Sequence, residues 1–514
     1  MEIRFSPGIN VIFGENGTGK TNIINSILKI LGPVYPGQNS FHKEDFFCQN
    51  ENNEILIDLY FDNEGREIRI RWDHVGNKKR LIMNSNDYIT DKLRDSFCPL
   101  HIPPNREIKD LPGSSKWTPI GRIIHEMAKT IEADERVLHD YKTKMQECTD
   151  ILEGSEDFSL FKDKIIEYAS EQLGGRGDHI NLKLGLLDHK HILKTLQLFE
   201  ENGTEQYNLS EGGQGVQSCV TMAALRAFSE VKGGSLFIIA DEPEAYLHPL
   251  AQKSLCNVFQ NIAETGTQII ITTHSPHFVP SKYFGGLIKV WMEKNKTKHK
   301  NINIQELNQR KIDRGISASI DGTKARLSKL LTVEIREGLF ANTVVLCEGE
   351  SESLSLEIWA KIANVDFAKK GIAVVPANGK FSLIELAEFY ANMNIKVFPI
   401  FDSDSATSRD RDRHIQNNRW LQEYCNVDNP EDFPATCVED SFCVFSPDYE
   451  RVLRNESACY SEYERDVNSE YGLEPGKQKG IRARYVSLKY LEEQEQLPDI
   501  IERLIDAITS FNDS

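Results

Sequence analysis

Several features that define common protein classes are missing from this chain of 514 residues. No apolar run approaches the roughly 20 residues that a membrane-spanning helix needs, and the N-terminus has no signal-peptide pattern. The ten cysteines have no short paired spacing, which argues against a disulfide framework or a zinc site and favours reduced thiols. We therefore expect a cytoplasmic protein without a membrane segment.

Basic residues are also in deficit, with 60 Lys and Arg against 78 Asp and Glu and a formal net charge of −18. This balance argues against a surface that is basic throughout, but a local basic groove suffices for contacts with phosphates. The candidates are Lys78–Arg80, Lys294–Lys300, Arg409, Arg411 and Arg413, and each is more often a solvated loop. The length exceeds what one hydrophobic core usually organises, so two or three domains are expected.

The most specific motif is a glycine-rich segment, Gly14–Thr21, with the sequence GENGTGKT. It follows an apolar strand pattern, Ile9–Phe13, and opens an amphipathic helix pattern, Asn22–Leu31. In such a loop the backbone N–H groups and the helix N-terminus bind a phosphate chain, the lysine reaches the outer phosphates and the hydroxyl ligates Mg²⁺. The residues expected to bind ATP are Gly14, Asn16, Gly17, Gly19, Lys20 and Thr21, with Thr21 also a metal ligand.

Three later segments follow this loop in an informative order. Asn208–Gly215 (NLSEGGQG) precedes a helical pattern, Ser235–Ala240 is a buried strand pattern that ends in Asp241-Glu242, and Gln268–Thr272 is a second strand that leads to His274. With the glycine loop, these segments resemble an ABC-type ATPase head of the SMC and RecF branch over residues 1–290. A charged helical insertion interrupts the resemblance at about residues 120–205.

The resemblance implies a role for each of these segments. Asp241 would hold Mg²⁺, Glu242 would position the attacking water, and His274 would contact the γ-phosphate. The segment with Ser210, Gly212 and Gly213 would meet the nucleotide of a second subunit, so a homodimer or a tetramer is implied. Relatives carry an additional strand before the apolar strand that leads into the glycine loop. Here only Met1–Gly8 precedes that apolar strand, so either the start codon is misplaced or this lobe is reduced.

A second group of acidic residues follows strand patterns in the C-terminal part. Thr343–Cys347 ends in Glu348, Ile372–Val375 precedes Asn378-Gly379-Lys380, and Lys396–Phe401 ends in Asp402-Ser403-Asp404. Strands that alternate with helices predict a parallel sheet, and functional groups gather at the carboxyl ends of its strands. Converging carboxylates need a cation, and oxygen ligands favour Mg²⁺ or Mn²⁺. A solvated acidic loop is the plain alternative for Asp402 and Asp404.

This pattern resembles a Toprim domain, and the E-G-x-S-E form of Glu348–Glu352 resembles the OLD family of ATP-dependent nucleases, which includes the Gabija endonuclease. Members join an ABC ATPase head to a C-terminal Toprim domain, as here. The resemblance implies a later acid pair and a lysine, for which Asp448, Glu450 and Lys479 are preferred over Glu439-Asp440 and Lys477. The expected metal ligands of this site are Glu348, Glu352, Asp402, Asp404, Asp448 and Glu450; they, Lys479 and Glu242 are the expected catalytic residues.

The expected fold is therefore α/β, with an ABC/RecF-like ATPase domain at 1–290, a helical connector at 291–340 and a Toprim nuclease domain at 341–514. The expected function is that of an ATP-binding, metal-dependent DNA endonuclease in anti-phage defence, with a helicase partner encoded elsewhere. The alternative is a RecF/SMC-like structural ATPase that binds DNA in repair and whose Toprim domain is inactive or depends on a partner.

Overall fold

The structure is a computed structural model of residues 1–514, and its described part leaves out residues 33–35, 37–39, 64–65, 76–77, 84–96, 105–118, 174–181, 186–198, 203–204, 209–215, 217–222, 225, 228–236, 281–282, 317, 407–409 and 475–476. The chain divides into two compact units, of which one combines Met1–Ile23 with Ile270–Ser514 and the other is Ile24–Ile269. The segments expected to form the ATPase head therefore fall in both units. The domain boundaries at 290 and 340 remain predictions.

The first unit contains a sheet around β1 (Ile9–Phe13), in the order β11-β10-β1-β9. β9 spans Gln268–Thr273, β10 spans Leu287–Glu293 and β11 spans Lys296–Asn301. β10 is parallel to β1 and antiparallel to β11. Lys296–Asn301, which lies just beyond the expected boundary at residue 290, pairs with β10 as an edge strand. Its lysines alternate with half-buried residues, which is the period-two pattern of a strand.

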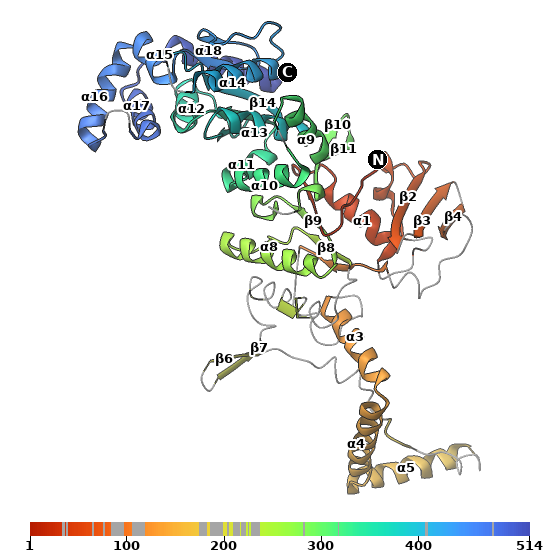
Figure 1. The fold of residues 1–514 in the computed structure, drawn as a ribbon. Coiled ribbons are helices and arrows are strands. Elements are labelled where there is room, and N and C mark those ends of the chain that lie inside the picture. Colours follow the sequence, from red (N-terminus) through yellow and green to blue (C-terminus); the bar gives the residue numbers. More distant parts are fainter. Residues whose placement is uncertain are drawn as a thin grey trace. The chain divides into compact units, whose positions relative to one another are not determined.

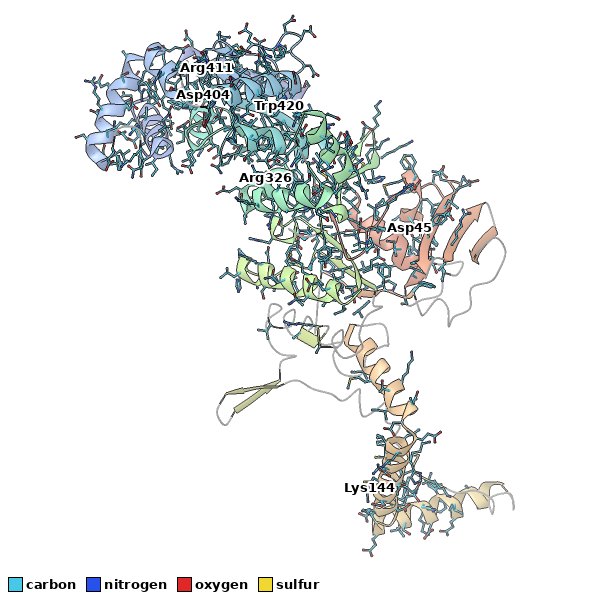
Figure 2. The ribbon with its side chains drawn as sticks, in the orientation of Figure 1. Asp45, Lys144, Arg326, Asp404, Arg411 and Trp420 are labelled. Atoms are coloured by element: carbon cyan, nitrogen blue, oxygen red, sulfur yellow. The ribbon has the colours of Figure 1, made fainter. Side chains whose placement is uncertain are left out.

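Short helices follow this hairpin, namely α9 (Ile304–Asp313), α10 (Ile320–Leu330) and α11 (Val333–Glu337). Ion pairs with buried Glu385 connect α9 and α10 to α13: Lys311 and Arg326 lie 2.6 and 2.8 Å from the carboxylate of Glu385. Figure 2 labels Arg326 on α10.

The C-terminal part of the same unit is a second α/β sheet (Figure 1). Its strands are β12 (Thr343–Cys347), β13 (Ile372–Pro376), β14 (Lys396–Asp402), β15 (Cys437–Val438) and β16 (Cys443–Phe445), in the order β13-β12-β14-β16-β15. Its helices are α12 (Glu350–Ile362), α13 (Lys380–Asn392), α14 (Arg411–Tyr424), α15 (Tyr449–Glu456), α16 (Ala458–Tyr471), α17 (Lys479–Glu493) and α18 (Asp499–Asp513). All pairs except β15–β16 are parallel, as the sequence predicts. Buried Val345, Trp359, Phe398, Tyr490 and Ile505 belong to the core between sheet and helices.

The second unit contains an antiparallel sheet of β2 (Ile55–Asn63), β3 (Arg66–Val75) and β4 (Lys78–Met83). β5 (Leu100–Ile102) pairs in parallel with β8 (Phe237–Asp241). The remaining elements are α1 (Lys20–Leu31), which begins in the first unit, α3 (Pro119–Ala133), α4 (Glu135–Glu153), α5 (Glu156–Leu173), β6 (Phe199–Asn202), β7 (Glu205–Asn208) and α8 (Pro249–Glu264). None of the helices described in either unit is long and apolar enough to cross a membrane.

Candidate functional site

The carboxyl ends of β12 and β14 open into a pocket of about 480 Å³. Glu348 follows β12, Glu352 lies in the first turn of α12, and Asp402 ends β14. Two more helix starts complete the wall, because α15 contributes Glu450 and α17 contributes Lys479. The residues that line the pocket are Glu348, Gly349, Glu350, Ser351, Glu352, Asn378, Gly379, Asp402, Glu450, Gln478, Lys479 and Gly480. Five of the expected Toprim site residues therefore share one cavity.

Backbone N–H groups orient two of these carboxylates. The N–H of Asp402 donates a hydrogen bond of 3.1 Å to Oε2 of Glu348, and the N–H of Tyr449 donates one of 2.9 Å to Oδ1 of Asp402. Tyr449 is itself anchored, because the indole N–H of Trp359 donates a 2.9 Å hydrogen bond to its hydroxyl group. Backbone N–H groups thus orient Glu348 and Asp402, the acids at the two strand ends.

Burial and mutual repulsion favour the protonated forms of three acids. Burial raises the pKa of Glu348 to about 7, with Asp404 adding to the effect and Lys380 opposing it. Burial raises the pKa of Glu352 to about 8, and the charges of Glu348 and Glu450 contribute. The pKa of Asp402 is also well above its usual value, first through burial and then through the neighbouring glutamates. These three acids therefore need further positive charge nearby to ionise fully at neutral pH.

A divalent cation would supply that charge. Carboxylate oxygens are the ligands that Mg²⁺ and Mn²⁺ prefer, so the donor set fits such an ion. In the described part of the chain, no three Asp, Glu, His or Cys side chains converge on one point closely enough to hold an ion. The carboxylates line one cavity without converging on a single point. Their fit to a metal ion therefore rests on their ligand chemistry and on the cavity that they share.

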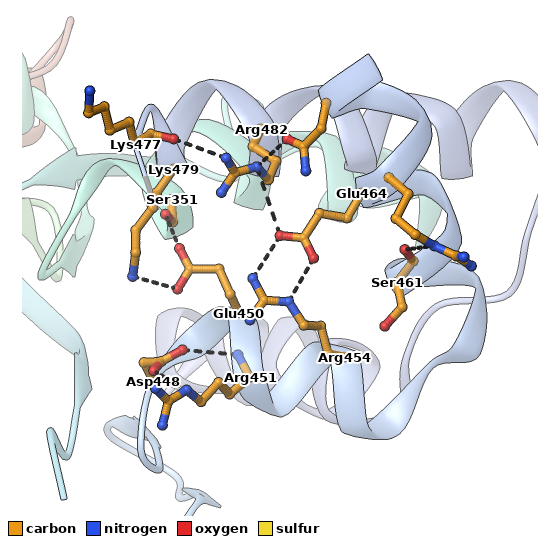
Figure 3. Close-up of polar contacts among 12 residues, drawn as sticks. Ser351, Asp448, Glu450, Arg451, Arg454, Ser461, Glu464, Lys477, Lys479 and Arg482 are labelled. Atoms are coloured by element: carbon orange, nitrogen blue, oxygen red, sulfur yellow. Dashed lines mark hydrogen bonds and ion pairs between the residues drawn. The ribbon is translucent and has the colours of Figure 1, made fainter. Parts of the chain in front are cut away.

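Glu450 and Lys479 form the charged pair at the other side of the pocket (Figure 3). Nζ of Lys479 lies 3.1 Å from Oε2 of Glu450, and the Ser351 hydroxyl donates a 2.7 Å hydrogen bond to Oε1. Burial alone would raise the pKa of Glu450, but Ser351 and Lys479 outweigh it and the net pKa is lowered. The pKa of Glu450 thus lies below its ordinary value, whereas those of Glu348, Glu352 and Asp402 lie above theirs. The close approach of α17 to α12 at this side of the pocket depends on Gly480, because a Cβ there would lie 2.7 Å from Cβ of Glu350.

Two of the expected ligands, Asp404 and Asp448, do not line the pocket and form hydrogen bonds with other groups. Nζ of Lys380 donates a 2.5 Å hydrogen bond to Oδ2 of Asp404, and Nδ1 of His414 lies 2.8 Å from the same oxygen. Figure 2 labels Asp404 in the C-terminal α/β part. Asp448 is the N-cap of α15, where it accepts a 3.0 Å hydrogen bond from the N–H of Arg451. Both acids lie beside the cavity, and their roles as ligands remain predictions.

The rival residues are placed on the surface. Lys477 pairs with Glu474 through exposed side chains, and Glu439 and Asp440 are exposed and do not line the pocket. Sequence reasoning missed Ser351 and Lys380. The signal for Lys380 was present, because Asn378-Gly379-Lys380 follows β13, a third parallel strand whose carboxyl end borders the same edge of the sheet.

The glycine loop lies between β1 and α1, as the sequence predicts. Nζ of Lys20 donates hydrogen bonds of 2.9 Å to the carbonyl groups of both Gly14 and Glu15, so the buried lysine is folded over the loop. Gly14, Gly17 and Gly19 all have positive φ, which curls the backbone as phosphate binding requires. Asn16 and Thr21 are exposed, and Thr21 lies in the first turn of α1, so the loop fits a nucleotide phosphate chain.

The other residues expected to act in the ATPase, among them Asp241, Glu242 and His274, are divided between the two units. Half-buried His274 directly follows β9 in the first unit. In the second unit, Asp241 ends β8 and is buried, and Glu242 follows it with a φ of 45°. Ser210, Gly212 and Gly213 lie outside the described residues.

Comparison with known proteins gives matches for both parts. Residues 77–279 match the AAA ATPase domain family, and residues 339–404 match the family described as Overcoming lysogenization defect protein-like, TOPRIM domain. The OLD nuclease of Thermus scotoductus is 24% identical over 81% of this chain and 83% of its own length. The Old nuclease of Escherichia phage P2 is 25% identical over 60% of this chain, which spans only 53% of that relative. A solved Smc head, bound to the C-winged helix domain of ScpA, superposes with a TM-score of 0.40 at 17% identity, over 59% of this chain and 93% of that one.

Proposed function

We propose that this chain, in which an ATPase domain is followed by an OLD-like Toprim domain, is a nuclease of the OLD family that hydrolyses DNA phosphodiester bonds in the Toprim pocket. The observation that carries the proposal is the shared cavity, in which four carboxylates and one lysine come from different strand and helix ends: Glu348, Glu352, Asp402, Glu450 and Lys479. A structural ATPase of the RecF or SMC kind has no need for such a cavity.

The four carboxylates would hold Mg²⁺ or Mn²⁺, which supplies an activated water and stabilises the leaving 3′-oxygen of the phosphodiester. Glu348 and Asp402 would form one ligand group and Glu352 and Glu450 the other. Lys479 would bind the scissile phosphate and neutralise its charge. The N–H groups that hold Glu348 and Asp402 would keep these two acids oriented while the substrate enters.

We also propose that ATP at Gly14–Thr21 gates access to this pocket through a homodimer or a tetramer. The curled loop and the buried Lys20 support nucleotide binding. Cleavage by the wild type and by Lys20→Ala, each with and without ATP, would test the gate, and equal rates in all four conditions would refute it. An anti-phage role and a helicase partner are further proposals that rest on the family resemblance, and a cytoplasmic location is one that rests on the sequence composition.

The nuclease is tested with the purified full chain, supercoiled plasmid and either Mg²⁺ or Mn²⁺. The comparison is between wild type, Asp402→Asn in the pocket and Asp440→Asn on the surface. Metal-dependent nicking by the wild type and by Asp440→Asn, lost in Asp402→Asn, is the expected result. Equal cleavage by all three proteins would contradict the proposed site.

A further inference from the structure

The hairpin formed by β10 and β11 presents two different faces along its edge strand. Lys294 and Asn295 both have positive φ and make the tight turn, and β11 then runs antiparallel to β10 at the edge of the sheet. Along β11, Lys296, Lys298 and Lys300 are exposed, and the residues between them are half-buried. One strand thus carries a row of like charges on its outer side.

The inner side of β11 is fixed to the glycine loop and the N-terminal segment. The Thr297 hydroxyl donates a 2.9 Å hydrogen bond to the carbonyl of Thr18, and Nδ2 of Asn301 donates one of 2.6 Å to the carbonyl of Arg4. A Cβ added to Gly19 would lie 2.5 Å from Oγ1 of Thr297, so the strand touches the loop directly. These contacts determine which way β11 faces, and therefore hold the lysine row outward.

The row is unusual in a chain whose formal net charge is −18. Alternate residues of a strand lie about 6.8 Å apart on one side. This spacing is similar to that of consecutive phosphates along a nucleic-acid strand, and lysine stems are long enough to adjust to it. The nearest acid paired with the row is Glu293, whose Oε2 lies 3.6 Å from Nζ of Lys298, and both side chains are about half exposed. A pair of this kind exchanges readily for a phosphate.

We propose that the outer face of β11 binds the phosphate backbone of DNA through Lys296, Lys298 and Lys300. The proposal rests on the proposed nuclease function for the identity of the polymer. Each ammonium group would neutralise one phosphate and release its condensed counter-ion, so the contacts add affinity without base specificity. Because Thr297 of β11 donates a hydrogen bond to the glycine loop, DNA on the outer face of β11 would contact a strand that also supports the nucleotide site.

The test measures binding separately from cleavage. A fluorescent DNA duplex is titrated with the full-length protein in EDTA over a series of KCl concentrations. The variant carries Lys296→Gln, Lys298→Gln and Lys300→Gln, and the control carries the same charge change at three exposed lysines outside β11, Lys329→Gln, Lys361→Gln and Lys369→Gln. The slope of log Kd against log salt should fall by about 0.9 for each lysine lost, and affinity near physiological salt should fall about tenfold to a hundredfold. The control should keep the wild-type slope.

An unchanged slope in the β11 variant would overturn the proposal, as would an equal fall in the control, since the effect would then be one of net charge alone. Lysines on an edge strand can also block pairing with another sheet. A β11 variant that self-associates in size-exclusion chromatography and keeps the wild-type salt dependence would assign the row that role and overturn DNA binding. Because no metal is present, a protein that cuts no DNA can still show the predicted slope.

Discussion

The ammonium group of Lys380, at the start of α13, and the carboxylate of Asp404, two residues after the end of β14, lie 2.5 Å apart. Lys380 is almost completely buried, with 3% of its side chain exposed. It also lowers the pKa of Glu348 against the larger effect of burial. The lysine is thus a buried cation that acts on Glu348 of the pocket, and it binds Asp404, an expected metal ligand that does not line the pocket.

Replacing Lys380 with methionine should destabilise the protein, because Asp404 and Glu348 lose their buried counter-charge. Loss of one partner from a buried ion pair typically costs about 3 kcal/mol. The cost should shrink when Asp404→Asn is added, since the carboxylate is then no longer left uncompensated. Urea unfolding of the two single variants and the double variant measures this coupling, and strictly additive losses would show that the pair is not coupled.

Lys479→Ala should lower kcat/KM for plasmid nicking by about a hundredfold, because one charge-stabilising donor to a reacting phosphate is worth this much. Lys477→Ala is the matched control, two residues away, with a side chain that is 72% exposed and pairs with Glu474. Single-turnover cleavage at saturating metal gives the comparison. A Lys477 variant as defective as the Lys479 variant would reverse the choice between these lysines.

Stability of the metal-free protein should fall as the pH rises from about 4.5 to about 8. Glu348 and Glu352 have folded pKa values of about 7 and about 8 against an ordinary value of 4.5, so the folded state binds more protons than the unfolded state in this range. Calorimetric melting in EDTA should give a higher Tm near the low end of the window than near the high end.

Two variants identify the origin of this pH dependence. Glu352→Gln should flatten the dependence of Tm on pH, while Glu357→Gln, on the exposed side of the same helix, should leave it as in the wild type. Added Mg²⁺ or Mn²⁺ should raise Tm most at high pH, where the acids have already lost their protons. A Tm that rises with pH in the metal-free wild type would contradict the assignment.

Thr297→Val should weaken ATP binding about fivefold, the equivalent of one hydrogen bond of about 1 kcal/mol. The variant removes the hydroxyl that donates to Thr18 of the glycine loop, while the side chain keeps its volume. Thr297→Ser retains the donor and should bind ATP almost as the wild type does. The affinity for a fluorescent ATP analogue measures both, and equal affinities for valine and serine would show that this contact does not support the loop.

The sequence by itself determined the elements that depend on local pattern. The predicted strands Ile9–Phe13 and Thr343–Cys347 coincide with β1 and β12, because a buried run between turn residues has few other conformations. The acids after β12 and β14 could also be predicted to meet, since parallel strands end at the same edge of a sheet.

Only the tertiary structure decided which charged groups face the pocket and which pair elsewhere. Asp402 and Asp404 are two residues apart, but Asp402 faces the pocket and Asp404 turns to Lys380 and His414. The polar run Lys294–Lys300 is a linker by composition and becomes an edge strand because β10 offers it hydrogen-bonding partners. Such choices depend on contacts between residues far apart in the chain, which no local pattern contains.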